Sequence, residues 1–156
     1  MYRLVLLDAW FLTHAGNATV WWVRTFRVHS NVFVYSMAAI ASIASMLVAA
    51  MDRSIVMLGF PFLVAFTLSI RWSRQERSIP TISTPVHGAC TVFLLWAIFM
   101  LTLGELSTFL MHPDAYSAVR GCATVSAFLG YFLLDYLSRI PPLEPPPGGK
   151  VSSAWV

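Results

Sequence analysis

Charged residues are scarce in this sequence. Asp, Glu, Lys and Arg make up 11% of the 156 residues, against about a quarter in soluble domains, while 58% of the residues are hydrophobic. A soluble domain of this length buries only about two-thirds of its surface, so it could not keep so many apolar side chains from water. The scarcity of charge excludes an ordinary soluble domain and indicates an integral membrane protein.

Lysine and cysteine are nearly absent too. Arginine carries almost all of the basic charge, because Lys150 is the one lysine, and the net charge is +3. In an apolar chain this excess points to membrane topology rather than to a nucleic-acid partner. Cys90 and Cys122 both fall inside apolar segments, so we expect small buried thiols rather than a disulfide.

Signatures of catalysis are missing as well. The sequence has no phosphate-binding loop, no nucleophile elbow and no HExxH metal motif. We therefore predict a protein that is not an enzyme, with no cofactor and no metal site.

What the sequence does contain is four long apolar runs. A helix needs about 20 apolar residues to cross a bilayer, and the runs cover residues 32–51, 54–70, 86–105 and 117–137. Arg120 and Asp135 interrupt the fourth run, and we expect both near its ends, where charged side chains reach the headgroups. The sequence predicts an all-α integral membrane protein whose four transmembrane helices form two hairpins, in a membrane domain over residues 31–139.

Residues 1–30 are apolar but interrupted. Asp8 and the polar positions around His14 lie between Arg3 and Arg24, and burying them in a fifth span without partners would be costly. Tryptophan side chains favour the headgroup level, where arginines can reach phosphates. We predict an interfacial or re-entrant N-terminal helix, and a fifth span is the alternative.

The other end of the chain is rich in proline. Proline removes backbone donors and favours an extended conformation, so residues 140–156 are predicted to form an extended tail.

Basic residues in the predicted loops follow one pattern. The N-terminal segment, the loop between the second and third runs and the C-terminal tail are basic, whereas the other two loops have no excess of positive charge. Basic loops stay on the inner side of a membrane. Both termini are therefore expected on the cytoplasmic or matrix side of a bacterial inner membrane or a mitochondrial inner membrane.

Glu105 stands inside an apolar stretch. A rise of about 1.5 Å per residue places it at the membrane interface opposite the basic side, where Arg120 begins the fourth helix. We predict a structural Glu105–Arg120 ion pair, since each charge lowers the cost of burying the other; an ion site is the alternative. Near the other end of the fourth helix, Asp135 and Arg139 have the spacing of an i,i+4 pair.

His29 and His87 open the first and third helices from the same side. Two such histidines could hold a haem, or one could contact a quinone headgroup. Both lie at helix ends, however, and no glycine pattern makes room for a porphyrin. We therefore favour histidines bonded to the backbone or to headgroups.

Small residues recur at helical spacing in two of the four helices. In lipid, such stripes let another helix backbone approach closely. We predict two helix-packing faces, formed by Ala38, Ala41, Ser42, Ser45 and Ala49 in the first helix and by Gly121, Ala123, Ser126, Ala127 and Gly130 in the fourth.

Together these features favour a non-catalytic accessory subunit of a larger membrane complex, of the energy-transducing or secretion type, that contacts other membrane subunits and phospholipids. A small oligomeric transporter or channel is one alternative, with Glu105, Ser107, Thr108 or the Ser42/Ser45 face lining a path. A haem- or quinone-contacting membrane anchor is the other.

Overall fold

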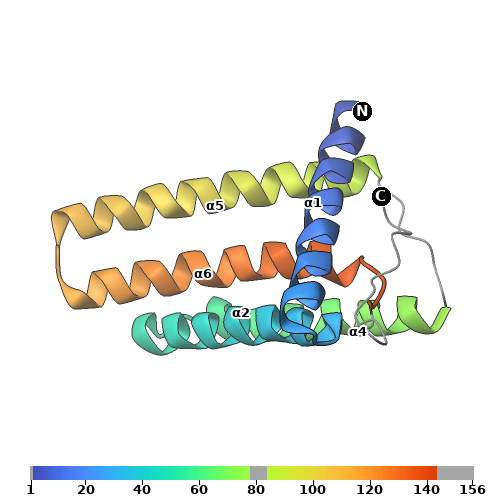
Figure 1. Ribbon diagram of the computed structural model, residues 1–156. Helices are drawn as coiled ribbons and strands as arrows, with labels where there is room; N and C mark the ends of the chain where they lie inside the picture. The colour runs from blue at the N-terminus through green and yellow to red at the C-terminus, as the bar shows by residue number, and fades with distance from the viewer. Residues whose placement is uncertain (1, 78–83, 144–156) are drawn as a thin grey trace.

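The computed structural model describes residues 2–77 and 84–143 (Figure 1), without the side chains of residues 75–77. Within these ranges the chain is helical and contains no strand. The helices are α1 Tyr2–Phe26, α2 Ser30–Asp52, α3 Ile55–Leu58, α4 Phe60–Arg77, α5 Pro85–Met111 and α6 Ala115–Ser138.

In the part of the chain that the structure describes, four helical segments are long and apolar enough to cross a membrane: α2, the stretch Ile55–Arg74 over α3 and α4, α5, and α6. The prediction of a helical chain with four such segments is confirmed. The bounds differ most in the third segment, because α5 extends to Met111, past the predicted end at residue 105. No helix breaker occurs before Pro113, so Glu105 lies inside α5 rather than at its end.

The second apolar segment is interrupted at Gly59. α3 ends at Leu58 and α4 begins at Phe60, while the Gly59 N–H still donates to carbonyls of the preceding turn. Pro61 follows two residues later, and a proline has no N–H to continue that pattern. The glycine and the proline together account for the interruption.

α6 is the central helix of the described chain. It packs against α1, α2, α4 and α5, whereas α5 packs only against α1 and α6. In Figure 1, α2, α4, α5 and α6 run along a common direction, and α1 runs across them at one end. We call the end with Ser30, Pro85 and Ser138 the α1 end, and the end with Arg53 and Pro113 the turn end.

Small residues bring α2 and α6 close together. A Cβ atom added at Gly130 would lie 3.2 Å from Ala41 Cβ and 3.4 Å from Ala41 Cα. Ala41 and Ala127 are both fully buried. The core around them consists of Val34, Ala38, Ala41, Ala44, Phe60, Val64, Ala127, Leu134 and Leu137. The two small-residue stripes of the sequence therefore meet each other inside the chain.

Some predicted members of these stripes lie elsewhere. In α2, Ala38, Ala41, Ser45 and Ala49 are buried and Ser42 is half-buried. In α6, Ala123 is buried with Ala127 and Gly130, but Ser126 is exposed and Gly121 faces the Glu105 side chain of α5. A helix turns by about 100° per residue, which carries Ser126 and Gly121 off the face that meets α2.

Cys90 and Cys122 are free thiols on the exposed surfaces of α5 and α6. The expectation that they are buried is therefore wrong, because both point away from the neighbouring helices of the chain.

The first residues of the C-terminal tail return to the start of α2. The Ser30 N–H donates to the Leu143 carbonyl at 3.1 Å, and the Leu143 N–H donates to Ser30 Oγ at 2.7 Å. The remainder of the predicted extended tail, residues 144–156, lies outside the described residues.

Candidate functional site

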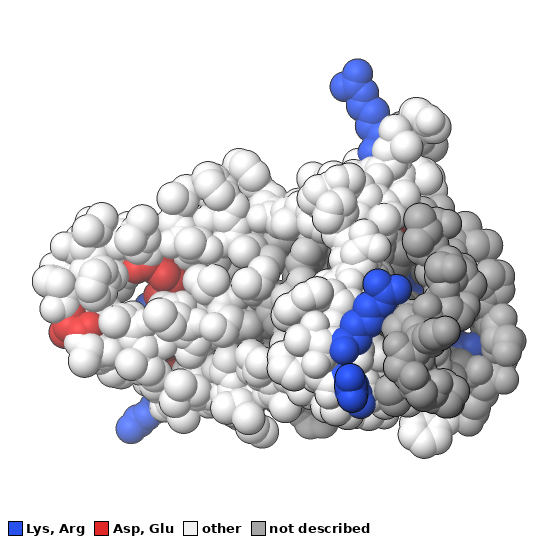
Figure 2. Space-filling model, in the orientation of Figure 1, with Lys and Arg blue, Asp and Glu red and all other residues white. Residues whose placement is uncertain are grey.

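Charged side chains gather at the two ends of the helices. Figure 2 shows acidic side chains at the turn end and several basic side chains toward the α1 end. Among the described residues, the ion pairs join Arg120 to Asp52 and to Glu105, and Arg139 to Asp8. Each of these contacts links two different elements of the fold.

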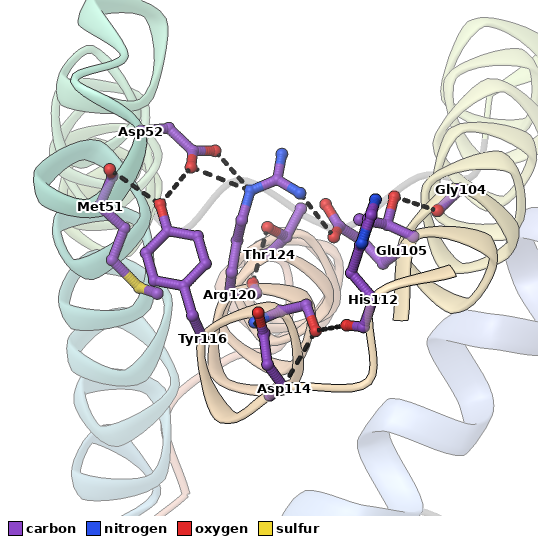
Figure 3. Close-up of polar contacts among 11 residues, drawn as sticks. Met51, Asp52, Gly104, Glu105, His112, Asp114, Tyr116, Arg120 and Thr124 are labelled. Atoms are coloured by element: carbon purple, nitrogen blue, oxygen red, sulfur yellow. Dashed lines mark hydrogen bonds and ion pairs between the residues drawn. The ribbon is translucent and has the colours of Figure 1, made fainter. Parts of the chain in front are cut away.

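At the turn end, Arg120 of α6 joins two carboxylates (Figure 3). Its Nε lies 2.7 Å from Asp52 Oδ2 at the end of α2, and its Nη1 lies 3.1 Å from Glu105 Oε2 on α5. The Glu105 side chain is 12% exposed, against 29% for Arg120. The structure brings together the two residues that the sequence pairs and adds Asp52 as a third member.

Tyr116 adds a second link between α6 and α2. Its hydroxyl donates to the Met51 carbonyl at 3.0 Å and to Asp52 Oδ1 at 3.3 Å (Figure 3). The role of Asp52 is not evident from its own surroundings in the sequence. The predicted membrane topology could have identified Asp52 as a member of this cluster, because Asp52, Glu105 and Arg120 all belong to the same side of the predicted spans.

Asp114 begins α6 beside this cluster as its N-cap. Its carboxylate accepts a hydrogen bond from the Ser117 N–H at 2.6 Å. This backbone hydrogen bond lowers the pKa of Asp114 below its ordinary value, because it favours the ionised form. The cap satisfies a backbone donor that has no partner within the helix, and so helps to set where α6 starts.

At the α1 end, Asp8 of α1 binds Arg139, which directly follows α6. Arg139 Nη1 lies 2.7 Å from Asp8 Oδ1, and Nη2 lies 2.8 Å from Oδ2. Such bidentate pairs combine strength with a fixed geometry. Asp8 is fully buried and Arg139 is 4% exposed. The ion pair therefore fastens the first helix to the end of the last.

Two buried hydroxyl groups and a set of rings extend this contact. Tyr136 of α6 donates to Asp8 Oδ1 at 3.1 Å and is hydrogen-bonded to Thr91 of α5. The Phe11 ring lies 5.3 Å from the Phe132 ring and 5.5 Å from the Tyr136 ring, measured between centroids. α1 is thus held by polar and aromatic contacts at the same level of the bundle.

The partner of Arg139 differs from the one expected. The sequence suggests Asp135, one turn earlier, whereas the ion pair in the structure is with Asp8, 131 positions away. Arg139 is the C-cap of α6 rather than a helical residue, so the i,i+4 geometry does not govern its side chain. A lone aspartate in an apolar helix signals that a partner exists, but nothing near Asp8 in the sequence identifies it.

Arg71 forms a further cluster at the α1 end. It is 7% exposed, and its Nη1 donates to the carbonyls of Leu137 at 2.6 Å and Ile140 at 2.9 Å. Its Nη2 donates to Asn31 Oδ1 at 2.8 Å. A guanidinium at a helix C-terminus satisfies free carbonyls and is favoured by the helix dipole. Arg71 therefore ties α4 to α6 and to the start of α2.

His29 and His87 lie at the α1 end, as the sequence suggests, and both contribute to helix caps. His29 Nδ1 accepts from the Asn31 N–H at 3.1 Å, and His87 Nδ1 lies 2.7 Å from Oγ1 of Thr84, the N-cap of α5. One nitrogen of each ring is thus engaged locally. Among residues 2–77 and 84–143, no group of three or more His, Cys, Asp or Glu side chains is arranged to hold a metal ion.

Two of the hydroxyl groups considered for a transport path, those of Ser45 and Thr108, have local partners. Ser45 Oγ donates to the Ser42 carbonyl at 2.9 Å, and Thr108 Oγ1 donates to the Gly104 carbonyl at 2.9 Å. Chemically, the clusters described above pair charges across helices and so fasten elements to one another.

Comparison of the chain with known protein families, with curated proteins and with solved structures finds no match.

Proposed function

We propose that the protein spans a membrane four times, with α1 in the membrane interface, and serves as a non-catalytic structural subunit of a larger membrane complex. The four apolar segments support the spanning part. The course of α1 across the other helices (Figure 1) supports its interfacial position. So do its exposed aromatic side chains, which are Tyr2, Trp10, Trp21 and Phe26.

The arginines support an orientation. Among the described residues, Arg53 and Arg120 belong to the turn end, and Arg120 is paired there with two carboxylates. The larger group belongs to the α1 end and consists of Arg3, Arg24, Arg27, Arg71, Arg74 and Arg139. Because basic segments stay on the inner side, the α1 end faces the cytoplasm or matrix, in a bacterial or mitochondrial inner membrane.

The main observation in support of a subunit role is the exposed surface of α5. Within the apolar window of α5, 11% of the residues are buried, against 44% for α6, and α6 is its only neighbour among the described spans. The open side carries a stripe at helical spacing that consists of Val92, Phe93, Trp96, Phe99, Met100 and Leu103. Aromatic and methionine side chains are enriched where proteins meet. A helix of another membrane subunit fits this stripe, and phospholipid covers the remaining apolar surface.

The test compares two exposed positions with a photo-crosslinking amino acid in intact membranes. Trp96 is 57% exposed on the α5 stripe, and Ile43 is 68% exposed on α2. Position 96 should give an adduct with an unlike membrane protein, and position 43 should give lipid adducts. Native electrophoresis in mild detergent should then place the chain in an assembly far above 17.4 kDa. A monomer, a pure homo-oligomer or lipid adducts at both positions would contradict the proposal.

A further inference from the structure

α1 touches the rest of the chain in a different way from the other long helices. It crosses α5, α6 and α2 near their ends, whereas α2, α4, α5 and α6 run alongside their neighbours (Figure 1). Its contacts are therefore confined to a few positions on each helix. These include the Asp8–Arg139 ion pair, the Phe11 ring contacts and the stacking of Trp22 on Phe33, with centroids 4.7 Å apart.

The crossing with α5 depends on a glycine. A Cβ atom added at Gly88 would lie 2.6 Å from the carbonyl carbon of Leu4, 2.9 Å from Leu4 Cβ and closer still to the Leu4 carbonyl oxygen. The backbone of Leu4 could not move away without lifting α1 from α5. Gly104, further along the same helix, has no atom within 4 Å of its added Cβ. Gly88 is thus specifically fitted to the docked position of α1.

The contacts that join the other helices do not involve α1. α2 meets α6 at Ala41 and Gly130, and Arg120 ties α6 to α2 and α5. Arg71 ties α4 to the end of α6. Contacts that do not involve α1 therefore hold the bundle of α2, α4, α5 and α6 together.

Asp8 and Arg139 lie far apart along the chain. Asp8 belongs to the first helix, and Arg139 follows the last one. The ion pair can form only after all four spans have been synthesised. Until then the Asp8 carboxylate lacks the bidentate contact with Arg139, and a buried charge that loses such a contact is strongly destabilising.

We propose that α1 is a strap that closes last: the four spans assemble first, and the Asp8–Arg139 ion pair then holds α1 across α5 and α6. Docking covers the hydroxyl groups of Tyr136 and Thr91 and removes the Asp8 charge from the membrane surface. A docked α1 therefore marks a chain whose fourth span is complete. This inference concerns the chain itself and does not rest on the partner subunit proposed above.

The experiment measures two proximities in full-length chains that carry Cys90→Ser and Cys122→Ser. Cysteines at Phe11 and Phe132 report docking of α1, and cysteines at Met51 and Tyr116 report the contact of α2 with α6 at the turn end. A short bifunctional maleimide is applied to intact membranes. Each reporter pair is tested with Asp8→Asn, Arg139→Gln and Gly88→Ala, and with Gly104→Ala as the matched control.

The proposal requires the 11–132 product to fall by at least about tenfold in Asp8→Asn, Arg139→Gln and Gly88→Ala, and to stay unchanged in Gly104→Ala. The 51–116 product should stay within about twofold of its starting value in all four variants, because the bundle does not need α1. An 11–132 product that persists in Asp8→Asn would show that the ion pair does not hold α1. Loss of both products together would show that α1 is part of the bundle's own folding and not a strap.

Discussion

Three arginine side chains of this protein hold helices together. Arg120 reaches two carboxylates on two helices, Arg139 reaches α1, and Arg71 reaches two carbonyls and an amide. A guanidinium offers five N–H donors in a fixed planar fork, whereas a lysine ammonium is a compact point charge. The geometry of these ties suits the strong preference for arginine over lysine in this chain.

Asp52, Glu105 and Arg120 form one charged cluster. Substitutions at these three positions should lower the free energy of unfolding by unequal amounts. Glu105→Gln and Asp52→Asn should each lower the free energy of unfolding, and Arg120→Gln should lower it more than either, by about 1–3 kcal/mol, because it breaks both contacts. Adding Glu105→Gln to Arg120→Gln should cause little further loss. The measurement is a double-mutant cycle by thermal unfolding in detergent. Additive losses would show that the two side chains do not act on each other.

Asp114 predicts a dependence of stability on pH. Its pKa is lowered in the folded protein, so its contribution is complete above the ordinary value of about 3.9 and is lost as the pH falls through the lower folded value. Asp114→Asn keeps a capping side chain without the charge. Its unfolding midpoint should therefore fall less than that of the unsubstituted protein between about pH 5 and pH 2.5. Parallel curves for the two proteins would contradict this assignment.

At the scale of helices, the contact between α2 and α6 depends on close approach of the two backbones. Gly130→Val should lower the free energy of unfolding by about 1–3 kcal/mol, because a side chain there meets Ala41 and forces the helices apart. Gly104→Val is the matched control, since its added Cβ meets no atom within 4 Å. Both variants can be compared by thermal unfolding. Equal effects would show that helix propensity, rather than packing, determines the outcome.

The helices themselves were largely predictable, because hydropathy and length decide which segments can cross a membrane. Glu105 and Arg120 were found for a related reason: spacing along two apolar runs fixes which side of the membrane each charge approaches. The predicted span ends at residue 105, whereas α5 continues to Met111, because the residues after Glu105 remain compatible with a helix.

The contacts that hold α1 against the other helices could not be predicted in the same way. Asp8 meets Arg139 because α1 crosses the end of α6, and no local pattern specifies the course of a helix relative to a distant one. The position of Ser126 is a second example. Spacings of three and four place several small residues near one face, but neighbouring residues such as Ser126 and Ala127 cannot both occupy its centre.

At the scale of the whole molecule, the two ends of the bundle should lie on opposite sides of the membrane. Single cysteines at Thr25, near the α1 end, and at Arg53 and Pro113, at the turn end, occupy exposed positions. In a background without Cys90 and Cys122, a maleimide that cannot cross membranes should label position 25 from one side and positions 53 and 113 from the other. Labelling of all three from one side would exclude the proposed arrangement of spans.

The contact between Asp8 and Arg139 also brings the first helix, α1, next to the end of the last helix, α6. Circular permutation succeeds mainly at exposed turns, and the exposed turn at Pro113 offers a new starting point away from the clusters of the α1 end. A permuted chain that begins with α6 and joins the old termini by a linker would keep every described helix. In this permuted chain Arg139 would be synthesised before Asp8. The side chain that binds α1 would therefore already be present when α1 is made.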